Sequence, residues 1–196
     1  MRVSDLKKKA TIPKIAWGIT GGGDRLQETV NTMKKLKETY ESEVDFRVYL
    51  SKAGEHVTKW YKLYESLKET FHRLWVESSP NSPFLAGELQ LGKFEFLLIA
   101  PATSNTVAKI AAGIGDTLLS NSAIMAAKAF VPVYVMPTDL REGTVVTRLP
   151  DGKNLRLRVR KEDAENTRML AAMDGIKLLE EPENIRGLFE KHFGQP

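Results

Sequence analysis

The chain has 196 residues, of which 42% are apolar and 28% charged, a composition typical of a globular protein with one full core. Because it contains no cysteine, disulfides, a cysteine nucleophile and cysteine-ligated metal centres are excluded within it. The net charge of +4 comes from scattered basic residues, so no nucleic-acid partner is expected. With no leading signal and no membrane-spanning apolar run, the sequence predicts a cytoplasmic protein without membrane contact. The three histidines are too dispersed to predict a metal site.

Strands and helices are predicted to alternate through a single domain, residues 1–196, after a polar N-terminal arm, residues 1–13. The first strand runs into three glycines, and Asp24 is predicted to cap the helix that follows. In chain order the predicted strands are 14–20, 44–50, 74–77, 96–100, 131–136 and 176–179. The other predicted helices are 55–71, one opening near residue 104, one beginning at Thr117, 162–173 and 183–193. This alternation predicts an α/β fold, a three-layer flavodoxin-like or Rossmann-like parallel sheet.

A β-hairpin is predicted to project from this sheet at 144–159. Apolar and polar residues alternate on both sides of the turn sequence Pro-Asp-Gly-Lys at 150–153. The loop at 78–92 carries two Ser-Pro pairs and is long enough to be a functional loop.

The stretch from Phe94 to Ala129 carries the strongest functional signal. A buried strand is predicted to stop at Pro101, which is not expected to continue a strand ladder. Four short polar residues, 103–106, then open a helix. Ligands in open α/β sheets lie at the carboxyl ends of strands, and helix N-termini attract anions. This turn therefore predicts a site for a phosphate-bearing cofactor.

Three further strand ends carry small or hydroxylated residues, at 20–22, 51–53 and 137–139. Since the carboxyl ends of parallel strands meet at one sheet edge, these residues are expected to line a common pocket for a flat ring and a phosphate. The glycines at 21–23 fit neither the dinucleotide fingerprint nor a P-loop.

The run Pro-Ala-Thr-Ser-Asn-Thr at 101–106, followed by Gly-Ile-Gly-Asp-Thr at 113–117, resembles the signature of a flavoprotein family. That family contains the phosphopantothenoylcysteine and lantibiotic cysteine decarboxylases and the flavin prenyltransferases. The Gly-Ile-Thr-Gly-Gly turn at 18–22 resembles it too. The resemblance implies non-covalent FMN between subunits of a trimer-based homo-oligomer. Together, this resemblance and the position of the strand ends predict twelve residues at the cofactor: Thr20, Gly21, Gly22, Ser51, Ala53, Pro101, Thr103, Ser104, Asn105, Thr106, Asp116 and Thr138. For Asp116 the alternative is a cap on the helix that begins at Thr117.

Two departures argue against cysteine decarboxylation. No histidine lies between His72 and His192, and the decarboxylases' Pro-x-Met-Asn motif is replaced by Val-Met-Pro-Thr-Asp at 135–139. A flavin prenyltransferase needs an allyl-phosphate site, and no basic cluster is evident near the strand ends. The chain is most similar to archaeal members of the family, the ferredoxin-linked flavoprotein and the FMN-dependent dihydromethanopterin reductase. The prediction is electron transfer through FMN, with dihydromethanopterin reductase as the alternative and a flavin carrier without turnover as a third reading.

No catalytic residue is assigned, because electron relay requires none. The arginine-rich hairpin is either a solvated edge or a docking surface for an acidic redox partner such as ferredoxin, and a small-molecule acceptor is also possible. Trp60, Tyr61 and Tyr64 are interpreted as core or subunit contacts rather than flavin-stacking rings.

Overall fold

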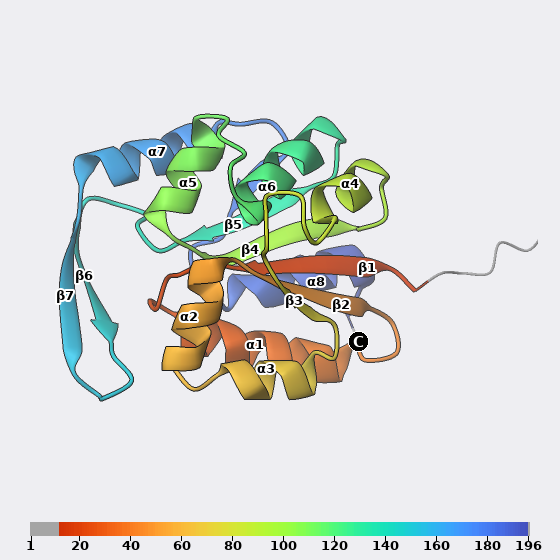
Figure 1. Ribbon diagram of the computed structural model, residues 1–196, viewed down its shortest axis with the longest axis horizontal. Helices are drawn as coiled ribbons and strands as arrows, with labels where there is room; N and C mark the ends of the chain where they lie inside the picture. Colours follow the sequence, from red (N-terminus) through yellow and green to blue (C-terminus); the bar gives the residue numbers. More distant parts are fainter. Residues whose placement is uncertain (1–11, 196) are drawn as a thin grey trace, which may run out of the picture.

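The computed structural model describes residues 12–195, so nearly all of the predicted N-terminal arm lies outside the described residues. Its centre is a six-stranded parallel sheet (Figure 1). The strands are β1 (Lys14–Ile19), β2 (Asp45–Leu50), β3 (Leu74–Val76), β4 (Phe96–Ala102), β5 (Val133–Pro137) and β8 (Ile176–Leu178). They are arranged in the order β3-β2-β1-β4-β5-β8. This order reverses direction between β1 and β4, as in doubly wound dinucleotide-binding sheets, and confirms the predicted fold class.

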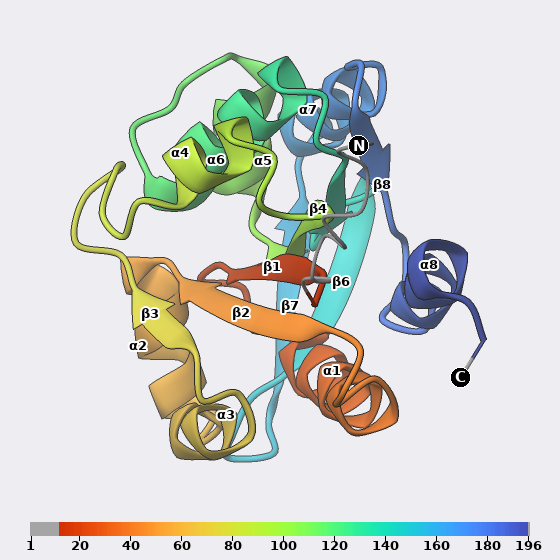
Figure 2. The ribbon, with the colours of Figure 1, turned by 90° about the vertical axis from the view of Figure 1, so that its right-hand side faces the viewer.

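Helices cover both faces of the sheet (Figures 1 and 2). One layer contains α1 (Leu26–Thr39), α2 (Lys52–Trp60), α3 (Tyr64–Thr70) and α8 (Asn184–Phe193). The other contains α4 (Leu85–Gln90), α5 (Ser104–Ala111), α6 (Leu118–Lys128) and α7 (Lys161–Ala171). Each layer packs a separate apolar cluster against the sheet. All seven residues of β4 are buried, because this central strand is covered on both faces. Within residues 12–195, no helix combines the length and apolarity that crossing a bilayer requires.

The predicted end of the central strand was wrong. β4 continues through Pro101 to Ala102 rather than stopping at the proline. The register with β5 shifts between Ile99 and Ala102, so the residue without an N–H lies at an irregularity, where the ladder needs no donor. The Pro101 carbonyl still accepts a hydrogen bond from the Thr20 N–H at 3.3 Å.

The single helix predicted at 55–71 is two helices, α2 and α3. Lys62 adopts a left-handed conformation (φ 58°), and the Leu63 N–H donates to the Thr58 carbonyl at 2.8 Å. This bond and the one from Lys62 N–H to the Lys59 carbonyl form a Schellman-type helix end. The position is usually glycine, so the sequence pattern gave no sign of it.

The predicted cap of α1 was also wrong. The N-cap residue is Arg25, in a left-handed conformation (φ 55°), and no side chain caps the helix. Asp24 is therefore released from capping, and its carboxylate lies close to the Arg25 guanidinium (3.7 Å) and the Thr147 hydroxyl (3.4 Å) instead.

The hairpin consists of β6 (Gly143–Arg148) and β7 (Asn154–Val159) and stands apart from the sheet, beside α2 and α5 (Figure 1). Its antiparallel register pairs Val145 with Leu157 and Val146 with Arg156. Because side chains alternate across a strand, the hairpin has one apolar face and one face rich in exposed arginines. The apolar face carries Val145, Thr147, Leu155 and Leu157, and the arginine face carries Val146, Arg148, Arg156 and Arg158.

Glu77 connects the two helix layers at the β3 edge of the sheet. Its buried carboxylate accepts from the N–H of Leu118, the first residue of α6, at 2.8 Å, and from the N–H of Lys52, the first residue of α2, at 3.4 Å. One side chain thus satisfies a leading N–H group of each helix.

Replacing Glu77 with alanine is expected to lower the free energy of unfolding by about 3 kcal/mol, because two hydrogen bonds to a carboxylate are lost and the buried Leu118 N–H is left without an acceptor. Urea denaturation of the protein without added ligand measures this change. Glu69→Ala, at an exposed position of α3, is the matched control and should change stability by less than about 0.5 kcal/mol. An equal effect of the two substitutions would contradict the assignment.

Candidate functional site

The site is built where the strand order reverses, between the carboxyl ends of β1 and β4. Thr20 joins the two strands there: its hydroxyl donates to the Pro101 carbonyl at 2.8 Å and accepts from the Thr103 N–H at 2.9 Å. The residue is 2% exposed, so this hydroxyl is fully engaged within the protein. Thr20 therefore holds the two ligand-facing turns in register rather than offering a hydroxyl to a ligand.

The turn after β1 requires glycine because other parts of the chain approach it closely. A Cβ on Gly21 would lie 2.7 Å from the Cβ of Ala53, in the first turn of α2. A Cβ on Gly22 would lie 2.9 Å from Thr138 Cγ2 and 3.5 Å from Thr103 Cγ2. The absence of side chains here leaves a small concave floor at the strand ends.

The turn after β4 presents the N-terminus of α5 to the same floor. Thr103 is the N-cap: its hydroxyl accepts from the Thr106 N–H at 3.4 Å and lies 3.1 Å from the Thr106 hydroxyl. The leading N–H groups of the helix, at Ser104 and Asn105, have no intrahelical partners. Asn105 is exposed, so its amide is accessible beside them. These groups are neutral or positively polarised, which suits a bound anion.

The two turns form one side of a cavity of about 350 Å³, within the size range of small-molecule sites. Its floor is Gly21–Gly23, Thr103–Asn105 and Thr138. One wall is the end of α2, with Val57, Trp60 and Tyr61, and the opposite wall is the apolar face of the hairpin. Apolar side chains thus face each other above a polar floor, a shape that fits a planar ring carrying a phosphate. No lysine, arginine or histidine is among the lining residues.

The structure brings half of the twelve predicted site residues to the cavity wall. These are Gly21, Gly22, Thr103, Ser104, Asn105 and Thr138. Thr20, Ala53, Pro101 and Thr106 contact or hydrogen-bond to these residues and position them.

Ser51 and Asp116 are engaged elsewhere. The Ser51 hydroxyl accepts from the Gly54 N–H at 2.9 Å as the N-cap of α2. Asp116 pairs with Lys109 at 2.9 Å and is exposed. The cap of α6 is Thr117, which forms a capping box with Ser120, so the alternative role for Asp116 was wrong. The contacts of Ser51 and Asp116 with a cofactor stay predictions.

Sequence reasoning missed the walls of the cavity. Trp60 and Tyr61, at the end of α2, were not predicted to line it. Their interpretation as core or subunit contacts still holds for Tyr61, which also packs against the core cluster. Asp24, Asp139 and the inner face of the hairpin were also missed. The signal was present for the hairpin, whose alternating pattern predicted one apolar face, but the pattern does not say which surface that face covers.

Two ionisable groups at the cavity have shifted pKa values. Burial raises the pKa of the Asp24 carboxyl, against the opposing effects of Arg25 and of the hydrogen bond from Thr147. Burial also raises the pKa of Tyr61, whose hydroxyl donates to the Arg148 carbonyl at 3.0 Å. These two side chains attach the hairpin to the body of the domain.

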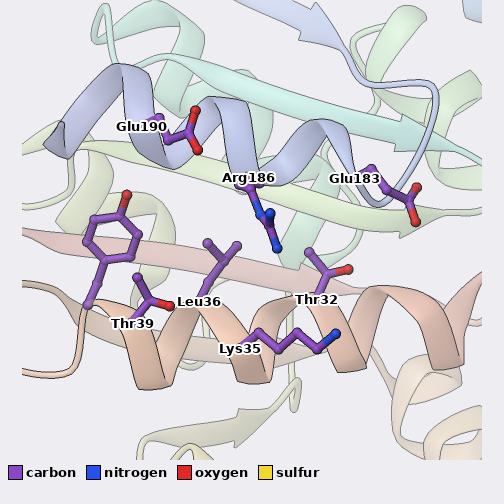
Figure 3. A pocket seen from close by; sticks show the side chains of 8 residues that line it. Thr32, Lys35, Leu36, Thr39, Glu183, Arg186 and Glu190 are labelled. Carbon is purple, nitrogen blue, oxygen red and sulfur yellow. The ribbon is translucent and has the colours of Figure 1, made fainter. Parts of the chain in front are cut away.

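A second, larger hollow of about 500 Å³ lies between α1 and α8 (Figure 3). Lys35 and Thr32 extend from α1, and Arg186 points toward them from α8 between Glu183 and Glu190. Charges of both signs line it, and no residue of the strand-end turns contributes. It is separate from the candidate site.

The fold and cavity together define an α/β protein whose cavity at the strand-order reversal suits a phosphate-bearing ring compound. The family model described as Flavoprotein matches residues 3–146, and the chain belongs to the Flavoprotein family. The predicted family is confirmed.

Related proteins extend this assignment. An uncharacterized protein of Methanocaldococcus jannaschii is 53% identical over 179 residues, which cover 91% of this chain and 95% of the relative. A dihydromethanopterin reductase (acceptor) of the same organism is 32% identical, and the alignment covers 90% of this chain and 95% of the reductase. The crystal structure of Burkholderia xenovorans DmrB in complex with FMN, described as a cubic protein cage for redox transfer, matches with a TM-score of 0.77 at 30% identity. That match covers 93% of this chain and 96% of the DmrB chain.

Proposed function

We propose that this protein binds FMN in the strand-end cavity and transfers electrons through it. The observation that carries the proposal is the cavity itself, with its anion-accepting floor and apolar walls, in a chain of the Flavoprotein family. Its similarity to an FMN complex described as acting in redox transfer supports the same function.

The residues present fit FMN. The phosphate would be held by the leading N–H groups of α5 and by Ser104 and Asn105. Gly22 leaves space that a Cβ would fill, and Trp60, Leu155 and Leu157 offer apolar surface to a ring.

FMN supplies one- and two-electron redox chemistry when bound, and the protein binds, orients and tunes it. The chain's own residues have three tasks in this function. Thr20 holds the turns after β1 and β4 together, the α5 N-terminus donates hydrogen bonds to the phosphate, and the hairpin limits the access of water to the ring. No lining side chain is a strong base, in agreement with electron relay.

The alternative is reduction of a small acceptor such as dihydromethanopterin, supported by the 32% identical relative of that name. A prenyltransferase is less well supported, because a diphosphate requires cationic side chains and the lining residues include none. A cysteine decarboxylase is disfavoured by the missing histidine and Pro-x-Met-Asn motif.

We also propose a homo-oligomer built on trimers. Trp60 is 57% exposed and Leu157 is 48% exposed, although both line the cavity, so the cavity is open on an apolar side. A second copy of the chain would cover this side and complete the site. The cage described for DmrB supports such an assembly.

The test is spectroscopic. The purified protein, incubated with FMN and passed through a desalting column, is expected to keep the flavin spectrum and to lose its visible flavin absorbance on anaerobic addition of reduced ferredoxin. Reoxidation by dihydromethanopterin would favour the reductase, and light scattering on the same sample should give a multiple of three 22.0 kDa chains. A colourless protein that does not bind added FMN would refute the proposal.

A further inference from the structure

Another hollow borders the cavity and shares lining residues with it. This outer groove, of about 620 Å³, lies between the start of α1 and the opposite face of β6. Gly23, Asp24, Tyr61 and Leu149 line both hollows. Among these shared residues, Asp24 alone has a carboxyl group, so one acidic side chain faces the cavity on one side and the groove on the other.

The Asp24 carboxyl is connected toward the cavity by a hydroxyl. The Thr147 hydroxyl donates to Asp24 Oδ1 at 3.4 Å, and Thr147 lines the cavity but not the groove. Thr147 is 7% exposed, so this contact is sheltered from bulk water. The groove side is open to solvent and carries the exposed side chains of Gln27 and Glu28.

Charged and hydrogen-bonding groups surround Asp24 from four parts of the chain. Arg25 and Glu28 belong to the start of α1, and Tyr61 to the end of α2. Thr147 belongs to the hairpin and Asp139 to the segment after β5. Burial raises the pKa of the carboxyl most, Glu28 and Asp139 add to the rise, and Arg25 and the Thr147 hydroxyl oppose it. The proton is therefore held more firmly than on an ordinary aspartate, even though the Arg25 guanidinium lies 3.7 Å from the carboxylate.

We propose that Asp24 relays the protons that accompany flavin reduction, taking them from the outer groove and delivering them to the cavity beside Thr147. Two-electron reduction of a flavin takes up two electrons and at least one proton. The electrons come from an external reduced donor, and the proton comes from the Asp24 O–H bond, which re-forms with a proton from water in the groove. This role rests on the proposed function.

The first test needs no flavin. In a ¹³C NMR titration of the protein without FMN, the Asp24 carboxyl is expected to titrate above the usual aspartate value of about 3.9. Thr147→Ala should raise this midpoint further, because a donor to the carboxylate is lost. A midpoint at or below the usual value would overturn the relay. Because the folded protein holds this proton more tightly than the unfolded chain, the carboxyl favours folding at low pH and loses that contribution as pH rises through the folded pKa.

The second test follows the relay itself. In the FMN-loaded protein, Asp24→Asn is expected to slow anaerobic reduction by dithionite roughly tenfold and to remove an inflection from its pH profile. Asp24→Glu should restore both. Glu38→Gln, at an exposed position of α1 that lines neither the cavity nor the groove, is the matched control and should change neither.

The outcomes distinguish the Asp24 proton relay from the proposed FMN function. A yellow Asp24→Asn protein with unchanged rate and pH profile would overturn the relay and leave the FMN function intact. A wild-type protein that binds no FMN would overturn both. If Asp24→Asn does not fold, Thr147→Val tests the same path, because it removes the hydroxyl that links Asp24 to the cavity.

Discussion

Gly22→Val is expected to abolish FMN binding. The Cβ alone would lie 2.9 Å from Thr138 Cγ2, and the two valine methyl groups would extend into the space between Thr138 and Thr103 on the cavity floor. An interior that is already close-packed cannot absorb this volume. Fluorescence titration with FMN measures the effect, and an affinity at least a hundredfold weaker, about 2.7 kcal/mol, is expected.

The matched control is Gly187→Val, a glycine of α8 around which a Cβ would meet nothing within 4 Å. It should bind FMN as the wild type does. Because Gly22→Val can also strain the turn, thermal melting of both variants without FMN must accompany the titration.

Asn105→Ala tests the site with less structural risk, since this side chain is exposed at the start of α5. It should weaken binding by about tenfold at most, the size of one hydrogen bond. Unchanged affinity in both Gly22→Val and Asn105→Ala would show that FMN binds elsewhere.

Reversing two charges on the hairpin is expected to slow electron transfer from reduced ferredoxin. Arg156 and Arg158 are exposed on the same face of β7, and Arg148 lies on that face of β6. The opposite face lines the cavity, so a protein docked on the arginines would be separated from the cavity by one β-layer, ~10 Å. An acidic donor is steered to such a surface by complementary charge.

In Arg156→Glu plus Arg158→Glu, the second-order rate constant at low salt should fall by about 10- to 100-fold, and the dependence on ionic strength should weaken or change sign. Stopped-flow mixing with reduced ferredoxin at several salt concentrations measures both. Lys35→Glu plus Lys191→Glu, on α1 and α8, changes the net charge equally at exposed positions away from the hairpin. Equal slowing by the two double variants would indicate an effect of net charge alone and refute docking on the hairpin.

Much of this site was predictable because strand ends in a parallel sheet share one edge. The sequence pattern alone places the hydroxyl-rich run at 103–106 and the glycines at 21–23 on the turns where the structure has them. Thr20 and Ser51 show the limit of that reasoning. A short polar side chain at a strand end can face a ligand or bond to its own backbone. Only the packed structure shows that the Thr20 hydroxyl both donates and accepts within the protein, whereas the Ser51 hydroxyl accepts from the Gly54 N–H.

By itself the sequence determined the alternation of strands and helices, the hairpin and the family signature, because these depend on local periodicity and short-range turn chemistry. The tertiary structure decided which surface the hairpin covers, where Asp24 points and which wall Trp60 joins. Those contacts link residues far apart in the chain, such as Thr147 with Asp24 and Tyr61 with Arg148, and no local pattern encodes them. The cavity is closed on one side because the segment after β5 places the hairpin beside the carboxyl ends of β1 and β4.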